Sequence, residues 1–234
     1  MPFEILFQDE WLCAINKPPG IMVHRSSIGT DRVFVMHRLR DQLGRHVWPV
    51  HRLDRATSGV LLFALDSDTA RELGQAFMDR RVDKAYRAVV RGWTDEDGVI
   101  DHPLARHKQA EPREARTRYR RLASCELPIP VGGFEAARYA LIEAMPETGR
   151  RHQIRRHFKH ISHHLIGDTT YGDGRHNRLF RQHLRCHRML LHASRLSLDH
   201  PWEGRRLKLT APLEAEFARV AAEAFGWNEE GVSD

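Results

Sequence analysis

Residues 51–59 read HRLDRATSG and place one carboxylate, Asp54, between Arg52 and Arg55. A carboxylate that stays ionised and faces an electrophilic carbon can act as a nucleophile. Neighbouring guanidinium groups favour the charged form of such an acid. A Thr-Ser-Gly turn and the apolar run VLLFAL follow, so we expect the acid at the edge of a buried strand. An aspartate that caps a turn and pairs with a surface arginine fits these residues equally well.

Two further residues are candidates for the same site. Tyr86 lies in the middle of KAYRAVVRG (84–92), which alternates like a strand. Its ring is either a core aromatic with a polar tip or a platform for a nucleobase, with its hydroxyl near the reacting ring. Arg155 lies in TGRRHQIRRHFKHI (148–161). It is either one more solvated or RNA-facing cation or the permanent counter-charge of a buried carboxylate, for which a planar guanidinium is well shaped.

The charge of the chain indicates a polyanionic partner. Lys and Arg number 37 against 31 Asp and Glu, which gives a net charge of +6 and a pI near 9.6. The arginines cluster in runs such as RRHQIRRH and RHNRLFRQHLRCHR. Clustered cations can follow a phosphate backbone, and binding of that kind weakens steeply with salt.

Cofactor and metal chemistry find little support in the sequence. It contains no GxGxxG after a strand, no GxxxxGK[ST] and no GxSxG. His157, His160, His163 and His164 lie close together, but their spacing does not match HExxH and the next carboxylate is Asp168. We therefore expect neither a cofactor nor a metal.

The cysteines and the apolar segments indicate in which cellular compartment the protein works. Cys13, Cys125 and Cys186 are far apart and odd in number, which is typical of a reducing environment. The N-terminus lacks the pattern of a secretory signal, and no apolar stretch approaches the length of a membrane span. We expect a cytoplasmic protein.

Hydrophobic residues make up 41% of the 234 residues, enough for a proper core. Strands follow one another without regular βαβ alternation, so we expect an α+β fold with a large, mostly antiparallel sheet. The expected elements are a hairpin of 3–7 and 11–15, helices at 33–43, 66–80 and 148–161, strands at 59–65, 84–92, 117–124 and 138–145, two closing strands around a turn at 201–204, and a helix in the last twenty residues.

Four ordered blocks resemble a known family. HRLDRATSGVLL (51–62) resembles the signature of the RluA-type pseudouridine synthases, and NKPPGIMVH (16–24), KAYRAVVRG and TGRRHQIRRH (148–157) are similar to its other motifs. The resemblance implies the pseudouridine synthase fold, a large mixed, mostly antiparallel sheet flanked by helices and loops, with a central RNA-binding cleft. It also implies one catalytic domain over 1–234, without the S4 RNA-binding domain that many members carry.

A finer resemblance is to the tRNA-modifying TruC branch of this family. It is carried by FQDEWLCAINKPPG (7–20), VHRS (23–26), VVRGW (89–93) and GDGRHNR (172–178). That branch implies isomerisation of uridine 65 in the T-stem of tRNA. The alternatives are ribosomal RNA or another tRNA position as the target, or, in a different class, an RNA-binding module without activity.

The resemblance also implies roles for the site residues. Asp54 is the expected nucleophile, Tyr86 the ring against the uracil, Arg155 the salt-bridge partner of Asp54, and Arg52 a side chain that helps displace the flipped base. The implied partner is RNA, with no membrane, no obligate protein partner and a monomeric enzyme. Residues expected to bind the RNA are Arg52, Arg55, Arg150, Arg151, His152, Gln153, Lys17 and Lys84.

Overall fold

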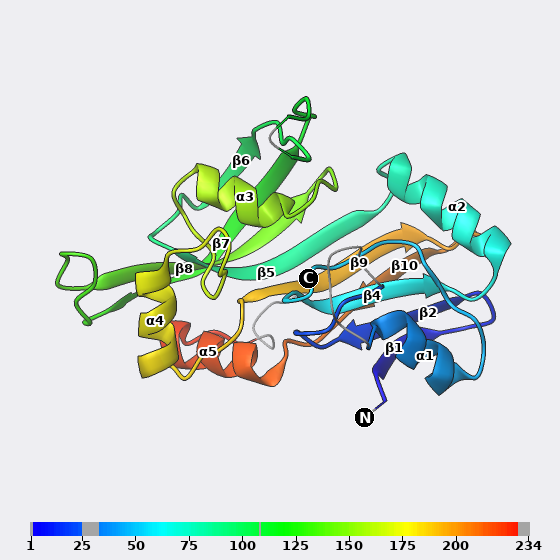
Figure 1. Ribbon diagram of the computed structural model, residues 1–234, viewed down its shortest axis with the longest axis horizontal. Coiled ribbons are helices and arrows are strands. Elements are labelled where there is room, and N and C mark those ends of the chain that lie inside the picture. The colour runs from blue at the N-terminus through cyan, green and yellow to red at the C-terminus, as the bar shows by residue number, and fades with distance from the viewer. Residues whose placement is uncertain (1, 25–32, 108, 229–234) are drawn as a thin grey trace. The chain divides into compact units, whose positions relative to one another are not determined.

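The computed structural model describes residues 2–24, 33–107 and 109–228 (Figure 1). Arg25 and Ser26 of the VHRS segment lie outside the described residues, as does the end of the chain. The chain divides into two compact units. Unit 1 comprises Met1–Lys84 and Ala193–Pro212, and unit 2 comprises Ala85–His192 and Leu213–Asp234. The single catalytic domain over 1–234 stays a prediction.

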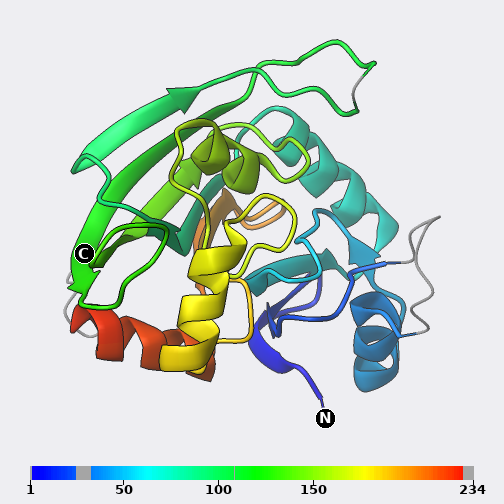
Figure 2. The same cartoon turned by 60° about the vertical axis from the view of Figure 1, so that its left-hand side comes forward.

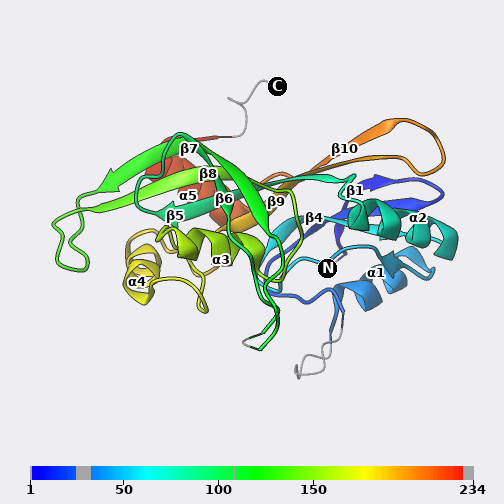
Figure 3. The ribbon, with the colours of Figure 1, turned by 90° about the horizontal axis from the view of Figure 1, so that it is seen from above.

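Unit 1 is built on antiparallel strands. The expected N-terminal hairpin is confirmed as β1 (Glu4–Gln8) and β2 (Leu12–Lys17), and β2 pairs along its whole length with β4 (Ser58–Ala64). Every residue of β4 is buried, as its apolar run predicts. The remaining elements are α1 (Val35–Leu43), β3 (Trp48–Pro49) beside β4, α2 (Ser67–Met78), and the hairpin of β9 (Leu191–Asp199) and β10 (Arg206–Thr210), which Figure 3 shows.

The start of α2 follows from local chemistry. The Asp66 carboxylate accepts hydrogen bonds from the backbone N–H and the hydroxyl of Thr69, at 2.8 and 2.7 Å. This is the N-cap contact that the sequence predicts. Leu73 is buried, and Ala70 and Phe77 pack against the same core, so the predicted apolar stripe is confirmed.

Unit 2 is also built on antiparallel strands, and helices pack on them. Its strands follow the order β5 (Asp83–Arg91), β8 (Ala137–Pro146), β7 (Arg116–Leu127) and β6 (Asp97–Asp101). Its helices are α3 (Gln153–His160), α4 (Gly174–His183) and α5 (Ala215–Phe225). The strand β6 and the helix α4 were not expected from the sequence.

The two faces of the unit 2 sheet carry different helices. Tyr86 is opposite Ala144 on β8, and Ala144 is opposite Tyr119 on β7. Directly opposed residues project from one face, and Tyr119 packs edge-on against Phe158 of α3 with ring centroids 5.4 Å apart. Tyr86 therefore lies on the face that α3 covers. The other face, which includes Tyr139, packs in one core with α4 and α5.

Strands β5 and β9 both continue across the division between the units. The hydrogen-bonded strand order is β1-β2-β4-β9 in unit 1 and β5-β8-β7-β6 in unit 2. With five helices in the described part of the chain, this confirms the predicted α+β class and the large, mostly antiparallel sheet. The helix predicted at 148–161 is shorter at both ends than expected. None of the described helices has the length and apolarity to cross a bilayer.

Candidate active site

Asp54 opens a tight turn at the entrance to β4. The Thr57 N–H donates to the Asp54 carbonyl at 3.1 Å, so the turn spans Asp54–Thr57. The expected Thr-Ser-Gly turn is therefore displaced, because Ser58 and Gly59 already belong to the strand. Asp54 is half-buried, between the exposed side chains of Arg52 and Arg55.

The loop of residues 17–20 holds this turn in place. The buried Lys17 ammonium group donates to the carbonyls of Pro18, Arg55 and Thr57 at 2.9, 3.2 and 2.7 Å. The backbone N–H of Gly20 donates to the Arg55 carbonyl at 2.8 Å, and Arg55 Nε donates back to the Gly20 carbonyl at 3.0 Å. All three ammonium donors of Lys17 are used inside the protein. These contacts give Lys17 a structural role, and its expected contact with RNA stays a prediction.

Gly59 brings the backbone of β4 close to that of Ala193 in β9. Its φ is +106°, and a Cβ built there would lie 2.2 Å from the carbonyl oxygen of Ala193. Only glycine tolerates both the conformation and the close contact. The Gly of the HRLDRATSG motif thus serves the packing of the strand that follows Asp54.

His51 anchors the other side of the Asp54 segment. Its Nε2 accepts a hydrogen bond from the Leu62 N–H at 2.9 Å, and its ring stacks on Phe77 at 4.9 Å. Burial, with a smaller effect of the Lys84 charge, lowers the pKa of His51 to about 3. The imidazole is neutral, as an acceptor must be. Burial also lowers the pKa of the Lys84 ammonium group to about 8.

Arg155 is buried in unit 2 and forms a bidentate ion pair. Its side chain is about 9% exposed, and its Nε and Nη2 donate to the two carboxylate oxygens of Asp168 at 2.6 and 2.9 Å. A fork-to-carboxylate pair fixes the plane of the guanidinium group as well as its position. The sequence analysis did not single out Asp168 for this role, although it lies in the motif-like stretch HLIGDTTYGD (164–173).

The loop around Asp168 is held by its own backbone contacts. Oδ1 of Asp168 also accepts from the N–H groups of Thr170 and Tyr171, at 2.8 and 3.0 Å. Burial alone raises the pKa of Asp168, but the hydrogen bonds from Arg155 and these two N–H groups outweigh it and leave the pKa below its usual value. The side-chain amide of Asn177 donates to the Asp168 carbonyl at 2.9 Å and ties the loop to α4.

Tyr171 is a second aromatic residue that the sequence analysis did not single out. The guanidinium carbon of Arg155 lies 5.1 Å from its ring centroid, within cation–π range. Its hydroxyl is 3.1 Å from Nδ1 of His152. The half-buried Tyr171 thus contacts the guanidinium group that Asp168 orients.

Gln153 begins α3 and explains why the helix starts late. Its Oε1 accepts from the Thr148 hydroxyl and the Arg150 N–H at 2.7 and 2.9 Å. Its Nε2 donates to Arg116 O and Thr117 Oγ1, both at 3.0 Å. The whole amide is buried and used inside the protein, which gives Gln153 a structural role, and its expected RNA contact stays a prediction.

The other predicted RNA-binding residues differ in exposure. Arg52, Arg55 and Arg151 are exposed. Arg150, His152 and Lys84 are half-buried, and Arg150 Nε donates to the Glu114 carbonyl at 3.0 Å. Asp54 and Lys84 lie in unit 1, whereas Tyr86, Arg155 and the 150–153 segment lie in unit 2.

The histidines of the 157–164 cluster serve internal contacts. Nδ1 and Nε2 of the buried His157 lie 2.9 Å from Thr117 Oγ1 and 3.1 Å from the His102 carbonyl. Nδ1 of His163 and Nδ1 of His164 lie 2.8 and 2.7 Å from the carbonyls of Arg91 and Tyr171. These contacts fit a structural role for the cluster and not a set of convergent ligands.

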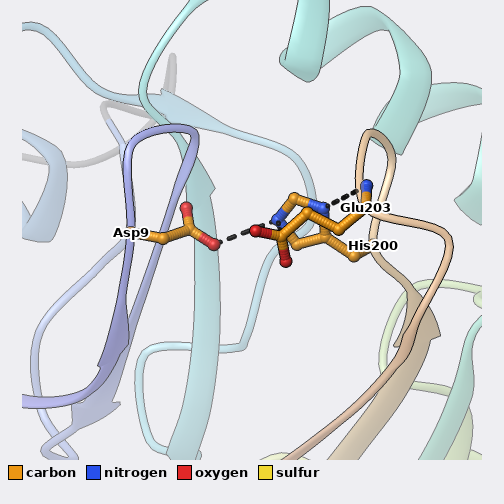
Figure 4. A group of neighbouring side chains, drawn as sticks. All are labelled: Asp9, His200 and Glu203. Carbon is orange, nitrogen blue, oxygen red and sulfur yellow. Dashed lines mark hydrogen bonds and ion pairs between the residues drawn. The ribbon is translucent and has the colours of Figure 1, made fainter.

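Within the described residues, one group of three has donor atoms close enough for a metal: Asp9, His200 and Glu203 (Figure 4). His200 Nδ1 accepts from the N–H groups of Trp202 and Glu203 at 3.2 and 3.1 Å, which puts the proton on Nε2. Nε2 then donates to Asp9 Oδ2 at 3.0 Å. Both ring nitrogens are engaged, so the group joins two turns of unit 1.

Comparisons with known proteins identify the family. A family model described as RNA pseudouridylate synthase matches residues 12–160. The tRNA pseudouridine synthase C of Vibrio cholerae serotype O1 is 48% identical, with 97% of each chain covered. That of Salmonella typhi is 47% identical, with 96% of this chain and 90% of the relative covered. These relatives confirm the resemblance to the TruC branch.

The solved structures agree with this result. Human RNA Pseudouridylate Synthase Domain Containing 4 is 26% identical and superimposes with a TM-score of 0.73, covering 93% of this chain and 91% of its own. Human RNA Pseudouridylate Synthase Domain Containing 1 gives a TM-score of 0.72 at 26% identity, covering 90% of this chain and 83% of its own. Pseudouridine synthases are isomerases, which is the enzyme class that the motifs predict. The chain belongs to the RNA pseudouridylate synthase family.

Proposed function

We propose that this protein converts a uridine of tRNA to pseudouridine, and that the uridine is position 65 of the T-stem. The observation that carries the proposal is its near-full-length similarity to relatives named tRNA pseudouridine synthase C, at 43–48% identity. The ordered motifs of the sequence give the same answer independently.

The reaction rearranges one nucleotide without gain or loss of atoms. The bond between N1 of uracil and C1′ of ribose breaks, the detached ring turns, and C5 bonds to C1′. The C5 proton is released and N1 gains a proton. The chemistry needs an anion beside the sugar and a pocket that retains the free uracil, and it needs neither a cofactor nor a metal.

We assign the anion to Asp54. It either attacks or stabilises C1′, or helps to form a glycal through C2′, and we leave both routes open. Its place in the turn Asp54–Thr57, fixed by hydrogen bonds to the 17–20 loop, supports the assignment because a nucleophile must be held in position.

We assign Arg155 as the permanent counter-charge of Asp54 and Tyr86 as the ring against the uracil. The bidentate pair with Asp168 supports the first role, since it fixes the guanidinium plane in a buried environment. The half-buried position of Tyr86 on the face of the sheet that α3 covers supports the second.

A uridine in a stem must leave the stack to be reached, at a cost of a few kcal/mol. Contacts from cations to the distorted backbone offset this cost. We propose Arg52 for displacement of the base and the exposed Arg55 and Arg151, with Arg150, His152 and Lys84, for the RNA backbone. We further expect a cytoplasmic monomer that works without a protein partner.

The proposal is tested by mapping pseudouridine in unmodified total tRNA and rRNA incubated with the pure protein. Carbodiimide labelling and primer extension detect each new pseudouridine as a stop, and Asp54→Asn is run alongside. We expect one new stop at position 65 of tRNA that the variant abolishes while its tRNA binding survives.

Other outcomes have distinct meanings. A stop only in rRNA, or at another tRNA position, would keep the chemistry and change the substrate. Turnover of Asp54→Asn within tenfold of the wild type would overturn the assignment of Asp54 as the nucleophile. Tight RNA binding without any stop would favour the non-catalytic RNA-binding module.

A further inference from the structure

The tip of the β7–β8 hairpin and the helix α4 form a shallow hollow in unit 2. The hollow has a volume of about 270 Å³ and is lined by the hairpin residues 129–132 and by α4. Figures 1 and 2 show the green hairpin tip near the yellow helix. Ile129, Val131 and Leu179 supply apolar lining, and Arg175 and Arg178 supply charge. We call the hollow, together with Phe134 and Arg181, the hairpin–helix surface.

The hairpin presents an aromatic ring rigidly. Val131 and Phe134 exchange both backbone hydrogen bonds, at 3.0 and 3.1 Å, around Gly132 and Gly133. The glycines have φ of +60° and +89°, the left-handed values that a two-residue hairpin turn requires. The Phe134 ring is 68% exposed. An exposed ring alone is common on protein surfaces, so its use for binding is inferred here from the arginines that lie beside it on α4.

The helix adds a row of cations beside the ring. Arg175 is held by Asp173, with Nη2–Oδ2 and Nε–Oδ1 distances of 2.9 and 3.2 Å, and lies under Gly132, where a Cβ would come within 3.0 Å of its Nη1. Arg178 and Arg181 are exposed, and neither forms an ion pair with another residue in the described part of the chain. The charge of Arg175 is balanced by Asp173, whereas the charges of Arg178 and Arg181 are not balanced by an ion pair among the described residues.

We propose that the hairpin–helix surface binds RNA, and that it holds a part of the tRNA substrate remote from the target uridine. Aromatic rings stack with unpaired bases and arginines contact phosphates, which is the combination present here. An acidic protein segment would match the charge but gives no specific use for a rigid, exposed aromatic ring.

The hairpin–helix surface lies far along the sheet from Tyr86. Tyr86 is opposite Ala144, and β8 begins at Ala137 next to the hairpin tip. Seven residues of strand span about 23 Å. Because α4 packs on the face of the sheet opposite to Tyr86, an RNA whose target base meets Tyr86 must extend at least that far, and past the hairpin tip, before it reaches α4. This inference rests on the proposed function, because Tyr86 marks the site of reaction only if that function is correct.

The test compares full-length unmodified tRNA with a short T-stem hairpin that contains the target. The dissociation constant is measured by fluorescence anisotropy at several salt concentrations, and kcat and KM are measured for pseudouridine formation. The test variants are Phe134→Ala and the double variant Arg178→Gln/Arg181→Gln. The matched controls are Met78→Ala and Arg40→Gln/Arg71→Gln, which remove an exposed apolar side chain and two exposed arginines elsewhere.

We expect Phe134→Ala to weaken binding of full-length tRNA by at least about fivefold. The double arginine variant should lower the slope of log K against log salt by about one to two. Both should raise KM for full-length tRNA, leave kcat unchanged, and behave like the wild type on the short hairpin. The control variants should bind both RNAs as the wild type does.

If the wild type, the test variants and the control variants bind full-length tRNA equally, the hairpin–helix surface does not bind RNA. The proposed function would stay intact. Equal weakening on both RNAs would place the surface near the target and overturn its remoteness. If the wild type forms no pseudouridine in tRNA, the proposed function fails, while the binding comparison still decides whether this surface contacts RNA. Binding only of an acidic peptide would assign it to a protein partner.

Discussion

At the scale of single residues, the main finding is that Arg155 has a buried acidic partner of its own. Asp168 accepts both donors of the guanidinium fork and also receives two backbone N–H groups. A buried cation that loses its partner is left uncompensated, which is far more costly than the loss of a surface pair. The position of Arg155 thus depends on Asp168.

Asp168→Asn should therefore lower the free energy of unfolding by about 3 kcal/mol, the lower end of the range for breaking a buried pair. Asparagine keeps an acceptor oxygen but carries no charge opposite Arg155. Urea denaturation at pH 7 measures the change. Asp199→Asn, which removes a partner of Arg206 at the surface, is the matched control and should change little. A similar effect of the two substitutions would contradict the role given to Asp168.

Tyr86 has two separable properties, a ring and a hydroxyl. Tyr86→Ala removes both and should lower kcat/KM by at least about fivefold, since stacking of a base on an aromatic ring is worth about 1–3 kcal/mol. Tyr86→Phe keeps the ring, so its turnover should stay closer to the wild type than that of Tyr86→Ala. Single-turnover kinetics on unmodified tRNA measure both variants. If Tyr86→Phe is as slow as Tyr86→Ala, the hydroxyl takes part in proton transfer.

The site was predictable from the sequence where a residue's role depends on its local motif. The position of Asp54 just before a buried strand was predictable, because the apolar run VLLFAL (60–65) follows it after a short turn. The pairing of Arg155 with Asp168 was not, because it joins a helix to a loop that the chain reaches 13 residues later. The internal hydrogen bonds of Lys17 and Gln153 were not predictable either, because a polar residue in a motif gives no sign that its donors are used inside the protein.

At the scale of elements, the same distinction explains the boundaries. The start of α2 was predicted because the Asp66 cap is three residues from its partner. The start of α3 was not, because Gln153 ends the preceding turn through contacts with Arg116 and Thr117 on β7. The strand β5 is less regular than its alternation suggested, because residues 87–90 are buried on both faces of the sheet.

His51 links the start of the Asp54 segment to β4 and makes this element sensitive to pH. The folded state keeps the imidazole neutral, with a pKa near 3, whereas the unfolded chain has an ordinary pKa of about 6.5. Between these values the unfolded state binds the additional proton, so stability is full above about pH 6.5 and falls as the pH is lowered.

His51→Gln removes the titrating group and keeps an acceptor for the Leu62 N–H. We therefore expect the free energy of unfolding of the wild type to fall more steeply from pH 7 to pH 5 than that of the variant. Urea denaturation across this range measures both. His46→Gln, at an exposed histidine, should retain the slope of the wild type. If the free energy of unfolding of His51→Gln depends on pH as steeply as that of the wild type, His51 is not the source of the pH dependence.

At the scale of the whole molecule, the ordered motifs were sufficient to predict the family and the fold class. They could not reveal the division into two units, because β5 and β9 each contribute residues to both and no linker marks the boundary. The helix α4 was missed for a related reason. Its sequence, GRHNRLFRQH, was interpreted by its charge, although Leu179 and Phe180 place it on the core of unit 2.

The net charge of +6 leads to a prediction about the complex as a whole. The four arginines proposed to contact RNA near the site, at positions 52, 55, 150 and 151, would neutralise four phosphates and contribute about −3 to −4 to the slope of log K against log salt. Asp54→Asn keeps the RNA substrate unmodified during the measurement and is the suitable parent. In that parent, adding Arg52→Gln and Arg55→Gln should reduce the steepness by about two, because both side chains are exposed beside the turn that carries Asp54. Adding Arg40→Gln and Arg71→Gln instead removes the same charge from α1 and α2 and should leave the slope unchanged. Equal slopes in the two variants would mean that overall charge, and not contact at the proposed site, controls the affinity for RNA.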